Sequence, residues 1–215
     1  ELYDITARAV RELTGFDRVM VYRYDEVYNG EVVAESKRAE LNSFLGLHYP
    51  ATDIPAQARA LYEKNWIRLI SDVDYTPAPI VSAVDPDGGA PLDLTYATLR
   101  SVSPIHVEYL QNMGVRASMS ISLLRHGRLW GLIACHHYAG PHLPPFGTRA
   151  AAEFLGSTLS LRLVDQFEDD QLHRRLAAQA VLTKLTAATL DDRETVAAAL
   201  LGDPNLLDLV TADGV

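Results

Sequence analysis

Two apolar segments joined by a short connection restrict most strongly how this chain can fold. Residues 117–124 and 129–137 have the length and the apolar content of strands. His126 and Gly127 lie between them, and glycine is typical of a tight turn. So short a connection joins antiparallel neighbours, because parallel strands need a long crossover. The sequence therefore predicts an antiparallel sheet.

Shorter patterns predict the other elements. Further strands are expected at 18–24, 31–36 and 67–70. Helices are expected at 1–14, 55–64 and 105–113. Asn29-Gly30 is a hairpin signal, and residues 74–93, rich in Pro, Asp and Gly, should form a loop. This order favours an α+β domain, in which helices flank the antiparallel sheet.

The segment from Phe146 to about Leu190 has no proline, and its leucines recur at helical spacing. One continuous helix of this length would span roughly 60 Å. Because its apolar stripe needs a partner, a homodimer through this long C-terminal connecting helix is expected. The predicted division is a first domain at 1–165, a connecting helix at 166–190 and the start of a second domain at 191–215.

The acidic composition excludes several classes of function. A net charge of −9 repels phosphate backbones and anionic lipid surfaces, so no nucleic acid and no membrane is expected as a partner. No run approaches the ~18 apolar residues of a membrane span. The chain's single cysteine, Cys135, excludes an intrachain disulfide, which suits a cytoplasmic protein.

Polar residues on the predicted strand 117–124 form the first candidate site. Ser118, Ser120 and Ser122 share one face of this strand. Such a row of hydroxyls either lines a ligand pocket and accepts an anion, or belongs to a solvated face of the sheet.

The segment before and within the predicted helix 105–113 is the second candidate site. His106 and Tyr109 share a face of this helix. Ser103 and the helix N-terminus can bind an anion, and Arg100 can pair with a carboxylate. A capped surface helix explains the same residues without a ligand.

Two further clusters carry a ligand hypothesis beside a purely structural one. Pro50 and Pro55 stiffen the chain around Asp53, which is either a helix cap or holds its carbonyl toward a ligand. Cys135, His136 and His137 alternate across a strand, so they cannot bind one metal together. We expect Cys135 to be a small buried hydrophobic residue, and one histidine to face the interior, where it can hold a ligand carbonyl.

Taken together and in this order, these segments resemble the GAF domain of bacterial phytochromes. The matching stretches are DRVMVYRY at 17–24, PATDIPAQARALY at 50–62, LRSVSPIHVEYLQNMGV at 99–115 and LWGLIACHHY at 129–138. The second and third are specific to phytochromes within the wider GAF family. By the same resemblance, residues 191–215 look like the start of a PHY domain.

The resemblance implies a red/far-red photoreceptor that binds biliverdin, a linear tetrapyrrole, and signals by isomerisation between its C and D rings. The signal would pass along the long helix to an output module, usually a histidine kinase with a response regulator. PAS and PHY domains of the same protein would flank this one. The chain itself is not expected to be an enzyme, because it has no ATP-binding loop.

The resemblance also implies the binding residues. The carbonyl of Asp53 and the ring of His106 would hold the ring nitrogens, and His136 would bond the D-ring carbonyl, with His137 facing out. Contacts with one propionate are expected from His106, Ser118, Ser120 and Ser103. Contacts with the other propionate are expected from Tyr62 and Arg100 and, in the second state, from Arg68. The remaining contacts are expected from Tyr22, Tyr109, Tyr49, Ile54, Pro55 and Ile105.

The covalent anchor departs from the family pattern. Plant and many cyanobacterial phytochromes attach the pigment through a cysteine where this chain has Ile105. Bacterial members use a cysteine near the N-terminus, ahead of a PAS domain. Cys135 matches neither position. Either the anchor lies in another part of the protein, or the pigment is bound without a covalent bond.

Three other functions compete with a light sensor. The first is a GAF domain for another small ligand, such as a cyclic nucleotide; the Pro50–Pro55 and Ser103–His106 motifs argue against it. The second is an enzyme with Cys135 as nucleophile, which the apolar run around that residue disfavours. The third is a dimerisation module on helix 146–190, which leaves the polar clusters unexplained.

Overall fold

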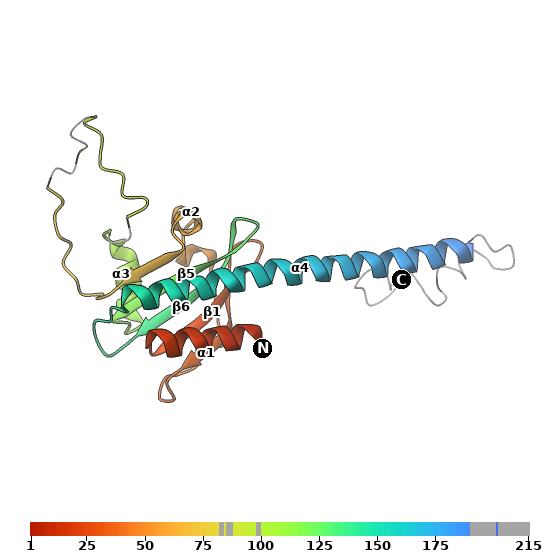
Figure 1. Cartoon of the computed structure of the whole chain (residues 1–215), viewed down its shortest axis with the longest axis horizontal. Coiled ribbons are helices and arrows are strands. Elements are labelled where there is room, and N and C mark those ends of the chain that lie inside the picture. Colours follow the sequence, from red (N-terminus) through yellow and green to blue (C-terminus); the bar gives the residue numbers. More distant parts are fainter. Residues whose placement is uncertain (82–83, 85–87, 98–99, 190–200, 202–215) are drawn as a thin grey trace. The chain divides into compact units, whose positions relative to one another are not determined.

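Six strands form a single antiparallel sheet in the order β3-β2-β1-β6-β5-β4 in a computed structural model of the chain (Figure 1). The structure describes residues 1–81, 84, 88–97, 100–189 and 201. The strands are β1 Arg18–Tyr24, β2 Gly30–Lys37, β3 His48–Tyr49, β4 Ile67–Ile70, β5 Ala117–Arg125 and β6 Arg128–His137. The predicted antiparallel sheet is confirmed, and only the two-residue β3 was not expected.

The two hairpins differ from each other in their turns. Between β5 and β6, His126 and Gly127 both have positive φ, as a tight hairpin turn requires. Between β1 and β2, the loop is longer: Tyr28 takes the left-handed conformation, and Gly30 already lies in β2. Asn29-Gly30 therefore marks the correct hairpin but is not its tight turn.

Four α-helices lie in the described part of the chain, and the sequence predicted all four. They are α1 Leu2–Thr14, α2 Ala56–Lys64, α3 Pro104–Asn112 and α4 Phe146–Thr189, and a 3-10 turn covers Ala51–Asp53. Gly15 ends α1 at a φ of 74°. The interpretation of Asp53 as a helix cap is wrong, because Pro55 occupies the cap of α2 and no side chain bonds there.

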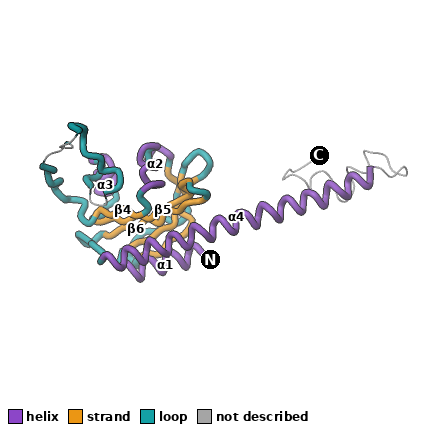
Figure 2. The backbone as a smooth tube through the Cα atoms, turned by 45° about the horizontal axis from the view of Figure 1, so that its top comes forward, coloured by secondary structure: helices purple, strands orange, loops and turns teal. Residues whose placement is uncertain are grey.

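The helices cover the two faces of the sheet differently. Figures 1 and 2 show α1 and the first part of α4 on one face, with α2 and α3 toward the other. Under α4, a Cβ on Gly156 would lie 2.5 Å from Cγ2 of Ile121, so the glycine permits close contact between helix and sheet. The Ser160 hydroxyl of α4 accepts the N–H of Leu124 of β5 at 3.0 Å, which is a second contact between this helix and the sheet.

The described chain divides into two units, Glu1–Leu161 and Arg162–Val215, and α4 is continuous across this boundary. The expected start of a second domain at 191–215 lies outside the described residues except for Leu201, so it stays a prediction. No helix in the described part of the chain is long and apolar enough to cross a membrane.

Candidate functional site

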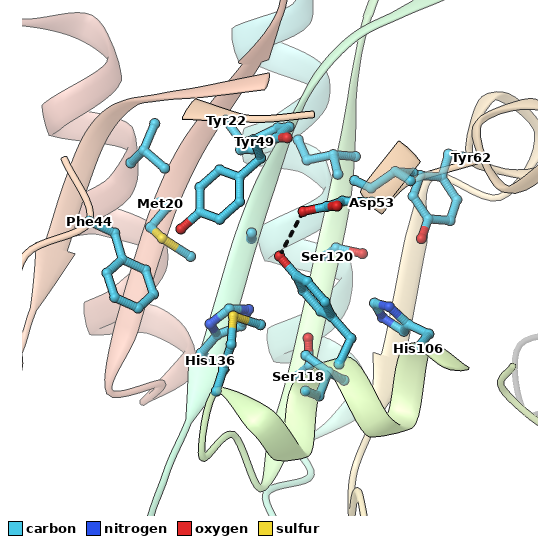
Figure 3. A pocket seen from close by; sticks show the side chains of 17 residues that line it. Met20, Tyr22, Phe44, Tyr49, Asp53, Tyr62, His106, Ser118, Ser120 and His136 are labelled. Atoms are coloured by element: carbon cyan, nitrogen blue, oxygen red, sulfur yellow. Dashed lines mark hydrogen bonds between the residues drawn. The ribbon is translucent and has the colours of Figure 1, made fainter. Parts of the chain in front are cut away.

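A pocket opens on the face of the sheet that carries α2 and α3 (Figure 3). Its empty volume is about 740 Å³, including the open mouth. The lining residues that the sequence predicted are Tyr22, Tyr49, Asp53, Ile54, Tyr62, His106, Tyr109, Ser118, Ser120 and His136. Residues from five separate segments of the chain thus meet in one place.

The floor of the pocket follows from strand alternation. Every second residue of a strand points to the same face. On three neighbouring strands these residues are Met20 and Tyr22 of β1, Leu132, Ala134 and His136 of β6, and Ser118 and Ser120 of β5. Of the serine row predicted from alternation, Ser118 and Ser120 are therefore part of a cavity wall, whereas Ser122 bonds the Tyr62 carbonyl and Arg68 instead.

One side of the pocket is a face of α3. His106, Tyr109, Leu110 and Met113, at helical spacing, all line it. The rings of His106 and Tyr109 stack with 6.3 Å between centroids and 13° between planes. Helical spacing could have added Leu110 and Met113 to the prediction, because they continue the face that His106 and Tyr109 begin.

The turn that carries Asp53 faces this helix. The hydroxyl of Tyr109 donates to Oδ2 of Asp53 at 3.4 Å, the dashed line in Figure 3. Burial and the neighbouring Asp53 raise the pKa of Tyr109 to about 12, so the phenol stays protonated and remains a donor at neutral pH. Burial likewise raises the pKa of Tyr22.

Both histidines of the pocket are neutral at physiological pH. His136 is 7% exposed, and its burial, together with the positive charge of Arg18, lowers its pKa to about 3. Burial and the nearby Arg68 lower the pKa of His106. A neutral imidazole offers one N–H donor and one acceptor. The buried Nδ1 of His136 has no hydrogen-bond partner within the described part of the protein.

Arg68 is half-buried and lies outside the pocket lining, but it contacts two lining residues, Tyr62 and Ser120. The Arg68 guanidinium lies over the ring of Tyr62 at 3.8 Å, and its Nε donates to Oγ of Ser120 at 3.0 Å. Nη1 donates to the Asn65 carbonyl and the Ser122 hydroxyl, whereas Nη2 is buried and finds no acceptor in the described residues. Burial lowers the pKa of Arg68 to about 10, which leaves it charged at neutral pH. Arg68 therefore has an unused donor for an anion.

The other predicted cation is occupied elsewhere. Arg100 does not line the pocket, and its Nη1 donates to the carbonyls of Thr95 and Ala97 at 3.0 and 3.3 Å. Ser103, Ile105 and Pro55 are exposed residues outside the lining as well. Of the two predicted arginines, Arg68 is the one that contacts pocket side chains.

Several lining residues were not predicted. They are Met20, Val32, Phe44, Leu110, Met113, Leu132 and Ala134. Phe44 belongs to the irregular segment between β2 and β3 and is packed against the Arg18 guanidinium at 3.6 Å. Arg18 in turn pairs with the buried Glu35. No local pattern in the sequence indicates this long-range contact.

No thiol of this chain lines the pocket. Cys135, the single cysteine, is fully buried and points to the opposite face of the sheet from His136. Burial raises its pKa far above neutral, so it is a poor nucleophile. Ile105 is 79% exposed. Among the described residues, no group of three or more His, Cys, Asp or Glu side chains could hold a metal ion.

Comparison with known proteins assigns the domain. Residues 1–164 match the GAF domain family. Cyanobacterial phytochrome B of Nostoc is 49% identical over 214 residues, which cover 100% of this chain and 28% of that protein. A bacteriophytochrome of Xanthomonas campestris is 46% identical, with 97% and 33% covered. The chain thus spans a third or less of the length of these relatives.

Solved structures agree with this assignment. The photosensory core module of Stigmatella aurantiaca phytochrome superposes with a TM-score of 0.84 at 45% identity, covering 98% of this chain and 41% of that one. The chromophore-binding domain of a bacteriophytochrome from R. palustris gives a TM-score of 0.74 at 43% identity, with 77% and 55% covered.

Proposed function

This chain belongs to the GAF domain family, in its phytochrome branch, and we propose that it is the biliverdin-binding part of a red/far-red light sensor. The observation that carries the proposal is a largely apolar pocket bordered by two unused buried polar atoms. These are Nδ1 of His136, which lines the pocket, and Nη2 of Arg68, which lies outside the lining and whose guanidinium contacts the lining residues Ser120 and Tyr62. Buried polar groups without partners are costly, so each favours a ligand atom.

The chemistry of a linear tetrapyrrole fits these residues. It is a long apolar conjugated system with two propionates and four ring nitrogens, and it needs apolar walls with a few fixed polar contacts. Arg68, with Ser120 beside it, is suited to one propionate, and a charged guanidinium binds a carboxylate strongly. We assign this contact to Arg68 rather than Arg100, since the bonds of Arg100 already serve a loop.

The neutral histidines suit the uncharged polar groups of the pigment. The neutral ring of His136 can donate one N–H to a carbonyl, which we take as its role at the D ring. The neutral His106 and the Asp53 carbonyl are suited to the ring nitrogens. Tyr22, Tyr49 and Tyr109 line the same pocket and would pack against the pigment.

Bound biliverdin would supply red absorption and, through isomerisation of the double bond between rings C and D, a change of shape driven by light. The residues of the chain would respond to that change by exchanging hydrogen bonds. The Tyr109–Asp53 bond, at 3.4 Å, is a weak contact on the pocket wall and is suited to break and re-form. Two alternative bonding patterns at Asp53 would bias the rest of the protein.

We assign the output to other parts of the full-length protein. The long α4 would carry the signal and pair with a second copy, as its exposed Phe154, Leu161 and Leu172 favour. A PAS domain, a PHY domain and a histidine kinase with its response regulator would complete a cytoplasmic sensor. The domain itself would be no enzyme, and the pigment anchor would lie outside this chain or be absent.

The test is light-induced spectroscopy of the full-length polypeptide mixed with biliverdin. We expect a red absorption band and a red/far-red difference spectrum under alternating illumination. Asp53→Ala should block photoconversion and raise fluorescence, and His136→Ala should shift the band or change the photoconversion yield. The surface variant Asp4→Ala should behave as wild type. A protein that stays colourless in the red, or an Asp53→Ala variant that switches normally, would contradict the proposal.

A further inference from the structure

The turn that carries Asp53 is hydrogen-bonded by the side chains of two residues that lie outside the pocket lining. We propose that Arg59 and Asn29 form a clamp that fixes the position of Asp53, and that the precision of pigment binding depends on this clamp. This inference rests on the proposed function. Neither residue lines the pocket, so both act as positioning residues.

Arg59 grips the turn on both sides of Asp53. Its Nη1 donates to the carbonyl of Ala51 at 3.1 Å and to the carbonyl of Ile54 at 2.5 Å. One planar guanidinium thus ties together the residues two before and one after Asp53. Lysine carries the same charge and three donors, but its ammonium sits on a flexible stem and lacks the planar, preorganised fork of a guanidinium.

The β1–β2 loop holds the clamp in place. The Arg59 guanidinium lies 4.3 Å from the ring centroid of Tyr28, a cation–π distance, and the Tyr28 hydroxyl accepts a bond from Arg128 at 3.2 Å. Tyr28 has a φ of 66°, which is uncommon for a bulky residue and sets its ring where Arg59 meets it.

Asn29 holds the N-terminal side of the same turn. Its Oδ1 accepts the N–H of Ala51 at 3.2 Å, while its Nδ2 donates to Oδ2 of Asp25 at 3.0 Å. The Asp25 carboxylate also accepts the N–H of Asn29 at 2.8 Å, so the amide of Asn29 is fixed in one orientation. Ala51 is therefore bonded at its N–H by Asn29 and at its carbonyl by Arg59.

The pattern of carbonyl bonding shows what the clamp leaves available. The turn carbonyls that accept protein donors are those of Pro50, Ala51, Ile54 and Pro55. The Asp53 carbonyl is not among them in the described part of the chain. Arg59 thus occupies the carbonyls of Ala51 and Ile54 and leaves the Asp53 carbonyl available, as its proposed contact with the pigment requires.

Two measurements on the full-length protein test the inference, one without pigment and one with it. The variants are Arg59→Lys and Arg59→Ala, and the control is Arg23→Ala. Arg23 lies in β1 of the same hairpin, but its bond runs to the half-exposed Glu31 side chain. In the pigment-free protein, hydrogen exchange at the Ala51 and Asp53 amides should accelerate roughly tenfold or more in both Arg59 variants. Exchange in β1 and β6 should stay unchanged.

With biliverdin, the Arg59 variants should bind pigment but show a displaced red band and a photoconversion yield reduced roughly tenfold, with Arg59→Lys between wild type and Arg59→Ala. Unchanged exchange in the turn would overturn the clamp. Faster exchange with a wild-type spectrum and photocycle would overturn its link to the pigment. If wild-type protein and the Arg23→Ala control bind no biliverdin, the proposed function is wrong. The hydrogen-exchange data then still test the clamp independently.

Discussion

The two faces of one sheet differ although they are built from the same strands. Val19, Val21, Ile133 and Cys135 point to the face under α1 and α4 and are fully buried. Their immediate neighbours Met20, Tyr22, Ala134 and His136 line the pocket. Because alternation puts neighbouring residues on opposite faces, the strand can hold the fold with one set and a ligand with the other. The two sets should then respond differently to substitution.

Ile133→Ala should have the largest effect on stability. Ile133 is fully buried on the face of the sheet under α1 and α4, which we call the dry face. Its truncation leaves a cavity and should lower the free energy of unfolding by about 2–5 kcal/mol. The spectrum of the pigment in the protein that remains folded should not change. Leu132→Ala, one residue away on the pocket face, should cost less stability and should change the spectrum. Denaturant titration and absorption spectra of both variants decide this; equal losses of stability would break the comparison.

Arg68→Ala should weaken pigment binding most among the polar variants. Loss of a charge-assisted hydrogen bond costs about 1.5–3 kcal/mol, or roughly a factor of 10 to 100 in affinity. Arg100→Ala should change affinity less than about threefold, because its bonds hold a loop. Fluorescence or absorbance titration with biliverdin measures both, and the reverse order would show that Arg100 holds the propionate.

Gly30→Ala should disturb the pocket by displacing the ring of Tyr22, a lining residue. A Cβ at Gly30 would lie 1.7 Å from the ring of Tyr22, so the ring must move, at a cost of about 1–3 kcal/mol. We expect a shifted red band in addition to a lower melting temperature. Gly114→Ala is the comparison, since no atom lies within 4 Å of its Cβ and only its positive φ opposes the change. It should lower the melting temperature and leave the band in place.

Acid should destabilise the pigment-free protein through His136. Its pKa is about 3 in the folded state and about 6.5 when unfolded, so the unfolded chain binds more protons between these values. The free energy of unfolding should therefore fall as the pH drops from 6.5 toward 3, by up to about 1.4 kcal/mol per pH unit from this residue. His136→Gln should flatten that dependence, and the exposed His173→Gln should not. Chemical denaturation across this pH range would refute the assignment if both variants kept the wild-type slope.

The sequence predicts well what depends on local periodicity. Alternation and helical spacing predict the strands, the helices and the shared faces of Ser118 with Ser120 and of His106 with Tyr109. The same periodicity could have supplied Met20 and Ala134. Local patterns cannot indicate contacts between distant segments, and for this reason Phe44 was missed.

Two other details also depend on tertiary packing. Gly30 reads as a turn residue, but in the structure it makes room for the Tyr22 ring. Asp53 reads as a helix cap, but its turn is held by Arg59 instead. In both cases the local pattern locates the hairpin or the helix correctly, and a side chain from the neighbouring strand or helix determines the role of the residue.

Biliverdin titration of three proteins, followed by absorbance in the red, tests the central claim most directly. The proteins are the full-length wild type, Ala134→Trp and Cys135→Ala. Ala134 lines the pocket, and Cys135 lies next to it on the dry face. The account predicts a red band that saturates at one pigment per chain for wild type and Cys135→Ala, and no band for Ala134→Trp, whose side chain fills the cavity. A wild type without a red band, or an Ala134→Trp variant that binds as tightly as wild type, would contradict it.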